Sequence, residues 1–172
     1  MKRIYLAGPM SGLPQFNFPA FYAAAEALRA CGYDVVSPAE LDDAEDAGAA
    51  MASEDGNPAH ATRSWGDFLA PDVKLLADGV ERDIQPEPSS EDATARVRLP
   101  IDGIVFLPGW EKSKGAKLEA FVGVLAGLEF ATVEVVHDEV IVEHRGLGWV
   151  LHQIAAQYAD EMAIHAPLTG AS

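Results

Sequence analysis

The amino-acid sequence predicts an α/β fold: an open parallel sheet of four to five strands with helices on both faces. Two observations predict it. Short apolar runs rich in β-branched residues alternate with segments of three- and four-residue apolar spacing, a pattern typical of repeated βαβ units. The chain has 172 residues, of which 49% are hydrophobic and 23% charged, which suits one globular domain with a sizeable core.

The first elements follow directly from local signals. Residues 3–9, RIYLAGP, are predicted as strand one, which ends at a Gly-Pro pair. Residues 18–32 are predicted as a helix, with Asn17 as its cap and a glycine at its end. Residues 33–38, YDVVSP, are short and apolar, and we expect strand two there.

The middle of the chain is less regular. Residues 42–63 are polar and rich in Ala, Asp and Gly without strong periodicity, and we expect a solvated loop. Residues 64–80 have helical apolar spacing with Ser64 as the N-cap, although Pro71 should kink the helix or mark a restart. Residues 81–100 are expected to form an exposed excursion or small hairpin inserted before strand three.

The last third of the chain returns to strand and helix alternation. Residues 101–108, IDGIVFLP, are predicted as strand three, and 114–130 as the helix after it. Residues 131–144 are predicted to form strand four and could hold an extra strand. Residues 147–165 are predicted as a C-terminal helix. The last residues, 166–172, form a tail outside the single domain of residues 1–165. This order fits a flavodoxin- or Rossmann-like layer system.

Composition excludes several function classes. The net charge of −15, without any cluster of Lys and Arg, argues against a nucleic acid polymer as partner. With one cysteine and five scattered histidines, we expect no disulfide, no metal and no cofactor. No apolar run is long enough to span a bilayer, and the start of the chain lacks the pattern of a signal peptide, so a cytoplasmic protein is expected.

Two glycine-rich turns are the first candidates for a ligand site. The turn after strand one contains Gly8, Ser11 and Gly12, and the turn after strand three contains Ser113 and Gly115. Both turns follow the carboxyl ends of parallel strands, where ligands bind in open α/β sheets. The alternative for the first turn is a simple chain reversal, and Ser113 could serve only as a helix N-cap.

Two carboxylates could belong to the same site. Glu119 lies one turn into the helix that starts near Ser113, among apolar neighbours, and Asp72 lies on the preceding helix. Two nonequivalent carboxylates in one crevice can divide the roles of nucleophile and acid. The alternative is that each is an ordinary exposed helix residue, in which case truncation of Glu119 would change stability by less than about 0.5 kcal/mol. Trp110 lies in the second turn, where it could cover a base, although packing is the simpler role.

Three stretches, residues 4–21, 64–76 and 104–119, resemble phage and bacterial proteins of the DUF4406 family. The family is grouped with the nucleoside 2-deoxyribosyltransferases and the 2'-deoxynucleoside 5'-phosphate N-hydrolases. The most specific element is Ser113-x-Gly115-x-x-x-Glu119. The resemblance implies an N-glycosidic-bond enzyme, a hydrolase or a transferase, acting on a small nucleoside or nucleotide, and a homo-oligomer.

The resemblance also implies roles for individual residues. Glu119 would attack C1' of the sugar, Tyr5 would keep that carboxylate ionised and aimed, and Asp72 would assist departure of the base. Substrate binding would fall to the first turn: Gly8, Pro9, Met10, Ser11 and Gly12. Ser113 replaces the acidic residue found there in nucleoside transferases, which favours a 5'-monophosphate, with Lys112 or Lys114 in place of an arginine missing from the first turn.

Two other functions stay open on the sequence. The chain could be a nucleotide-binding or sequestering module that has lost its chemistry. It could also be an NAD-type glycohydrolase, although the chain is short for a site that holds a second nucleotide half. The C-terminal helix could serve a dimer contact through Trp149, Leu151, Ile154 and Met162, or could simply cover the sheet of its own chain.

Overall fold

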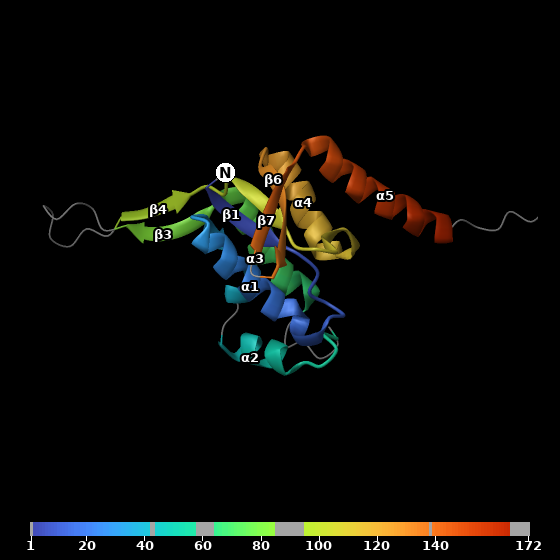
Figure 1. Cartoon of the computed structure of the whole chain (residues 1–172), viewed down its shortest axis with the longest axis horizontal. Coiled ribbons are helices and arrows are strands. Elements are labelled where there is room, and N and C mark those ends of the chain that lie inside the picture. Colours follow the sequence, from blue (N-terminus) through green and yellow to red (C-terminus); the bar gives the residue numbers. More distant parts are fainter. Residues whose placement is uncertain (1, 42–43, 58–63, 85–94, 138, 166–172) are drawn as a thin grey trace, which may run out of the picture.

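The main body of the molecule is a five-stranded sheet in the order β2-β1-β5-β6-β7 (Figure 1). The computed structural model describes residues 2–41, 44–57, 64–84, 95–137 and 139–165. The strands of this sheet are β1 Arg3–Ala7, β2 Asp34–Val36, β5 Gly103–Phe106, β6 Glu129–Val136 and β7 Glu139–Arg145. All neighbours pair in parallel except β6 and β7, which form an antiparallel pair. The predicted α/β fold is confirmed.

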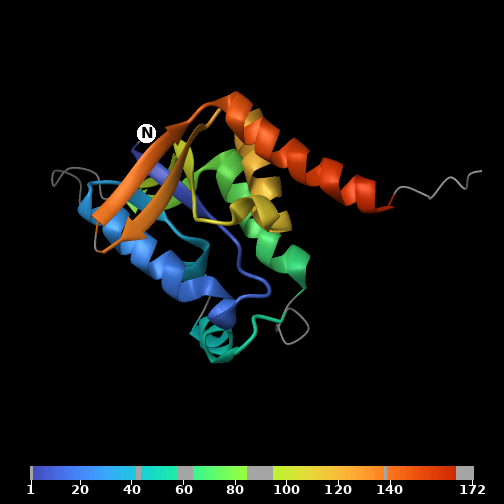
Figure 2. The same ribbon diagram turned by 45° about the vertical axis from the view of Figure 1, so that its right-hand side comes forward.

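Side-chain alternation along β1 divides the core into two layers. Ile4 and Leu6 pack on the face covered by α1, whereas Tyr5 and Ala7 point to the face that carries α3, α4 and α5. Figure 2 shows α1 on one side of the strands and α3 and α4 on the other. The side chain of Tyr5 therefore lies on the face of the sheet that is covered by α3, α4 and α5.

Four helices begin at or next to their predicted first residues: α1 Phe18–Ala30, α3 Trp65–Asp78, α4 Lys114–Ala126 and α5 Leu147–His165. Helix α2, Ala44–Ala52, was not expected. Helix α3 runs through Pro71 without a restart. Its start is a capping box, in which the Ser64 hydroxyl accepts from the Asp67 amide and the Asp67 carboxylate accepts from the Ser64 amide. Asn17 is at the N-cap of α1, but its side chain donates instead to the Pro9 carbonyl at 2.9 Å.

One expectation about the middle of the chain is wrong. Residues 42–63 are not all loop, because residues 44–52 form α2. The sequence AEDAGAAMA has weak periodicity but five alanines, the strongest helix former, so propensity rather than pattern decides here. Residues 42–43 and 58–63 lie outside the described residues.

Three large apolar residues of α4 face solvent, whereas Val122 and Val124 pack against the core. Leu118, Phe121 and Leu125 are 39%, 46% and 74% exposed, and we call these three residues the α4 stripe. The buried face of α4 carries Ala116, Lys117, Glu119, Ala120 and Gly123. Small residues allow α4 to lie close to the strands: a Cβ added at Gly123 would come within 2.5 Å of Ile104 Cδ1. The close approach turns Glu119 inward and leaves the larger side chains outside.

Residues 81–100 contain a small hairpin, as expected. Strand β3, Val80–Ile84, pairs antiparallel with β4, Ala95–Leu99, and the hairpin extends from the main body on the side opposite the end of α5 (Figure 1). Its tip, residues 85–94, and the predicted tail, residues 166–172, lie outside the described residues.

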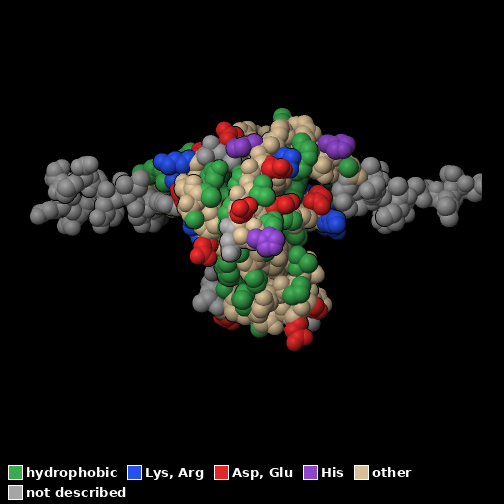
Figure 3. Space-filling view, viewed as in Figure 1, with side chains coloured by type: hydrophobic (Ala, Val, Ile, Leu, Met, Phe, Trp, Pro, Cys, Tyr) green, Lys and Arg blue, Asp and Glu red, His purple; other side chains and the backbone are tan. Residues whose placement is uncertain are grey.

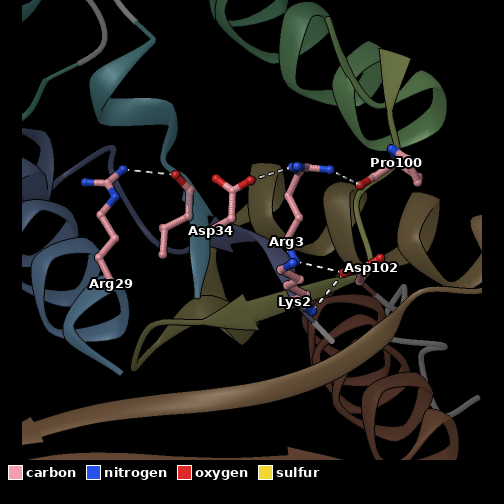
Figure 4. Close-up of polar contacts among 7 residues, drawn as sticks. Lys2, Arg3, Arg29, Asp34, Pro100 and Asp102 are labelled. Atoms are coloured by element: carbon pink, nitrogen blue, oxygen red, sulfur yellow. Dashed lines mark hydrogen bonds and ion pairs between the residues drawn. The ribbon is translucent and has the colours of Figure 1, made fainter. Parts of the chain in front are cut away.

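A polar network fixes the start of β1 (Figure 4). Asp102 Oδ2 accepts hydrogen bonds from the amides of Arg3 and Lys2 at 2.8 and 2.7 Å. These bonds, from Arg3 first, lower the pKa of the Asp102 carboxyl. Arg3 also pairs with Asp34 at 2.8 Å, which joins β1 to β2. The network therefore sets the register of the three strands that lead to the carboxyl edge.

Surface charge is dispersed on the face drawn in Figure 3, where acidic and basic side chains are scattered rather than gathered into one continuous patch. In the described part of the chain, no helix is both long enough and apolar enough to cross a membrane. The cytoplasmic location stays a prediction.

Candidate functional site

A cavity of about 620 Å³ opens beyond the carboxyl ends of β1 and β5. Six parts of the chain line it: the first turn after β1, the start of α1, the segment after β2, α2 with the turn after it, the first half of α3, and the first turns of α4. Its size is that of pockets for small molecules. The strands place the two glycine-rich turns beside one another because β1 and β5 are paired in parallel, with Ala7 opposite Phe106.

Glu119 is the buried polar group at the floor of this cavity. The residue is 6% exposed, and the Tyr5 hydroxyl donates a hydrogen bond of 2.7 Å to its Oε1. Asp72 from α3 lines the same cavity and interacts electrostatically with both Tyr5 and Glu119. The structure therefore brings together Tyr5, Asp72 and Glu119, the three side chains for which catalytic roles were predicted.

Burial controls the protonation of this cluster. The pKa of Glu119 is raised from 4.5 to about 8, first by burial and then by the negative charge of Asp72, while the hydrogen bond from Tyr5 acts in the opposite direction. The pKa of Tyr5 is also raised, first by its own burial and then by the charge of Glu119. The hydrogen bond from Tyr5 lowers the pKa of Glu119, which is the direction expected for a donor to this carboxylate, but burial has the larger effect. The role of Tyr5 in keeping Glu119 ionised stays a prediction.

The first turn has an unusual backbone. Gln15, Phe16 and Asn17 have φ values of 55°, 48° and 61°, three consecutive non-glycine residues in the left-handed region. Such a conformation costs free energy and persists only where surrounding contacts hold it. Those contacts come from both sides: the Gln15 amide donates to the Ser53 carbonyl at 2.7 Å, and Asn17 holds Pro9. As a result, Phe16 lines the cavity.

The same turn is joined to the segment after α2. The Gly12 amide donates to the Gly56 carbonyl at 2.9 Å. Gly56 has a φ of +61°, and a Cβ there would come within 2.0 Å of the Leu13 carbonyl oxygen, so only glycine fits. These contacts make the segment that follows α2 a wall of the cavity, and the first turn and this wall form one unit.

Helix α4 begins at the cavity. Ser113 is its N-cap, and the Ser113 hydroxyl accepts a hydrogen bond of 3.3 Å from the Ala116 amide. The capping role considered as an alternative for Ser113 is therefore present, although the residue also lines the cavity. Lys112 and Lys114 are exposed and are absent from the cavity lining, so neither replaces an arginine there.

The predicted ligand-contacting residues divide into two groups. Those that line the cavity are Gly8, Met10, Ser11, Asp72, Ser113, Gly115 and Glu119. Pro9 and Gly12 belong to the first turn but do not line the cavity. Trp110 is 2% exposed and stacks on Phe106 with ring centroids 4.0 Å apart, so it belongs to the core rather than to the site. Trp110 packs into the core because Phe106 and Trp149 provide aromatic partners there.

One wall of the cavity was not predicted from the sequence. Its residues include one aromatic side chain of α3 and three carboxylates of the α2 segment: Phe68, Asp46, Glu54 and Asp55. The alanine content of residues 44–52 was the signal for a helix there. No local pattern showed that this helix would face the turn after β1. Among the described residues, no group of three or more His, Cys, Asp or Glu side chains is arranged to hold a metal ion.

Comparison with known proteins matches only the amino-terminal part of the chain. No curated protein and no solved structure matches it. The matched segment contains β1, the first turn, α1, β2 and α2, but neither Asp72 nor the helix that carries Glu119. Residues 2–55 are similar to a family described as "Domain of unknown function (DUF4406)".

Proposed function

We propose that this cavity breaks the N-glycosidic bond of a nucleoside or nucleoside 5'-phosphate through a covalent glycosyl ester on Glu119. The observation that carries the proposal is a carboxyl group buried at the floor of a nucleoside-sized cavity, held by Tyr5 and facing a second carboxylate, Asp72. Desolvation of an acidic group is costly, and perturbed carboxyl groups in cavities are typical of catalytic sites. The similarity to known N-glycosidic-bond enzymes noted in the sequence supports the same reading.

The chemistry divides between the two carboxyl groups. An ionised Glu119 oxygen forms a bond to C1', and the electron pair of the C1'–N bond leaves with the base, which takes a proton from Asp72 when its nitrogen needs one. Water, or the nitrogen of a second base, then attacks C1' and gives its proton to the Asp72 carboxylate, while the bond from C1' to Glu119 breaks and restores the Glu119 carboxylate. Two displacements give net retention at C1'. Tyr5 orients the carboxylate through its hydrogen bond, as a positioning residue.

The raised pKa of Glu119 has a consequence for this mechanism. The nucleophile must be ionised, so the active form of the free protein becomes more abundant as pH rises toward about 8. A positive charge developing on the sugar in the transition state favours the ionised carboxylate, and in a water-poor cavity that interaction is strong. The ionised Glu119 carboxylate is therefore poorly stabilised in the empty cavity and well stabilised in the transition state.

The test is a product assay. The protein is incubated with a panel of deoxyribo- and ribonucleosides and their 5'-monophosphates, with and without a second base, and free base and exchanged nucleoside are separated by chromatography. Release or exchange of base by the wild type, lost in Glu119→Gln and retained in Glu129→Gln, supports the proposal. Glu129 is an exposed glutamate at the start of β6, outside the cavity lining. Ligand binding by the wild type without release of base from any substrate would instead identify a binding module and refute the enzyme.

A further inference from the structure

The lining of the cavity is strongly acidic. Its carboxylates come from three walls, namely the α2 segment, α3 and α4: Asp46, Glu54, Asp55, Asp67, Asp72 and Glu119. Asp67 forms part of the capping box of α3. Among the described residues that line the cavity there is neither a lysine nor an arginine. Since the walls exclude water from part of the cavity, the field of these groups is felt by any ligand inside it.

Aromatic rings stand among these carboxylates. Phe16, Trp65 and Phe68 line the cavity, and Trp65 is 54% exposed although it is the largest side chain of the lining. A ring face beside an acidic group is the arrangement that attracts organic cations, because the negative face of the ring and the carboxylate act in the same direction. A dianionic phosphate in the same space would meet like charges from three walls.

From this arrangement we infer that the cavity takes a positively charged, unphosphorylated ligand: a nucleoside whose base carries a quaternary ring nitrogen. The inference on binding stands on the cavity lining, and the inference on its chemistry rests on the proposed function. It differs from the 5'-monophosphate suggested by Ser113 alone, because a hydroxyl that caps α4 is one donor among several carboxylates.

A cationic base also suits the chemistry of the two carboxyl groups. When Glu119 bonds to C1', the electron pair of the C1'–N bond neutralises the ring nitrogen, so the base leaves without a proton. Asp72 then need not hold the proton of a general acid, and its charge can remain. A cation in the cavity further opposes the mutual repulsion of Glu119 and Asp72, which contributes to the raised pKa of Glu119 in the free protein.

The experiment compares three ligands that differ in charge and little else. They are nicotinamide riboside, which is a cation; its neutral 1,4-dihydro form; and the 5'-monophosphate of the cationic riboside. Dissociation constants are measured by titration calorimetry on the Glu119→Gln protein, so that no ligand is consumed. We expect the cationic riboside to bind at least about tenfold more tightly than either of the others, a ratio that decreases with added salt.

Two double variants test whether the cavity wall causes the preference. Glu54→Gln with Asp55→Asn removes two charges from the lining and should reduce the ratio between cation and neutral form severalfold. The control, Glu26→Gln with Glu134→Gln, removes two charges from exposed positions outside the lining and should leave it unchanged. Circular dichroism melting confirms that both variants fold.

The outcomes separate this inference from the proposed function. Tighter binding of the 5'-monophosphate, equal binding of all three ligands, or no binding of the cationic riboside would overturn the inference, even if the wild type releases base from another nucleoside. Preferential binding of the cationic riboside without release of nicotinamide by the wild type would sustain the inference and count against the enzyme.

Discussion

Replacing Glu119 by glutamine should stabilise this protein while removing its activity. The carboxyl group is buried, and its Oε1 accepts the Tyr5 hydroxyl hydrogen bond. An amide of the same shape retains an acceptor for Tyr5 and carries no charge. The small effect expected for an exposed glutamate therefore does not apply to this position.

The size of the effect follows from the pKa. The carboxyl titrates near 4.5 in the unfolded chain and near 8 in the folded protein. Because the folded state holds the proton more tightly, the contribution of this group is fully present below pH 4.5 and is lost as pH rises to about 8. Each pH unit in this window corresponds to about 1.4 kcal/mol. At pH 7 the wild type should therefore be less stable than Glu119→Gln by about 3 kcal/mol, and at pH 4 the two should be nearly equal.

The assay is urea denaturation of both proteins at pH 4, 7 and 8, with the free energy of unfolding extrapolated to water. Glu119→Ala serves as a comparison, because it removes the charge but leaves a small void and a Tyr5 hydroxyl without its partner, so its gain at pH 7 should be smaller. A Glu119→Gln protein that is no more stable than the wild type at pH 7, or a stability difference that does not grow with pH, would refute the reasoning.

Four further perturbations have expected outcomes. Tyr5→Phe removes the hydrogen bond that lowers the pKa of Glu119, so the rise of kcat/KM with pH should move to higher pH; an unmoved profile would contradict the positioning role. Ser113→Ala should lose about 1 kcal/mol of stability and Ser113→Asp should retain it, as measured by thermal melting, because aspartate also caps a helix. The buried Ser37 hydroxyl has no hydrogen-bond partner among the residues that the structure describes, so Ser37→Ala should be neutral or stabilising by about 1 kcal/mol, and a clear loss of stability in denaturation would contradict this expectation. Finally, we propose that the α4 stripe lies in a homodimer contact; light scattering should give twice the 18.3 kDa chain mass, Phe121→Asp should give a monomer, and a monomeric wild type would contradict the proposal.

The sequence by itself determined the layers of the fold. Alternating apolar runs and helical spacings are local properties, and they located the strands, α1, α3, α4 and α5 because each element must bury one face. It also located Glu119, Asp72 and Ser113, since turns at the carboxyl ends of parallel strands meet at one edge of the sheet. The N-cap of α3 at Ser64 was an equally local signal.

Only the tertiary structure decided which way the helices face and what surrounds the carboxyl groups. The spacing of Leu118, Phe121 and Leu125 is helical, but it does not say whether that face or the face of small residues meets the sheet; packing against Ile104 and Phe130 selected the small one. This choice buried Glu119 and raised the pKa of its carboxyl, because desolvation depends on every neighbouring element and not on residue order. The acidic wall from α2 has the same origin: its contact with the first turn depends on backbone hydrogen bonds at Gly12 and Gln15, which leave no pattern in the amino-acid sequence.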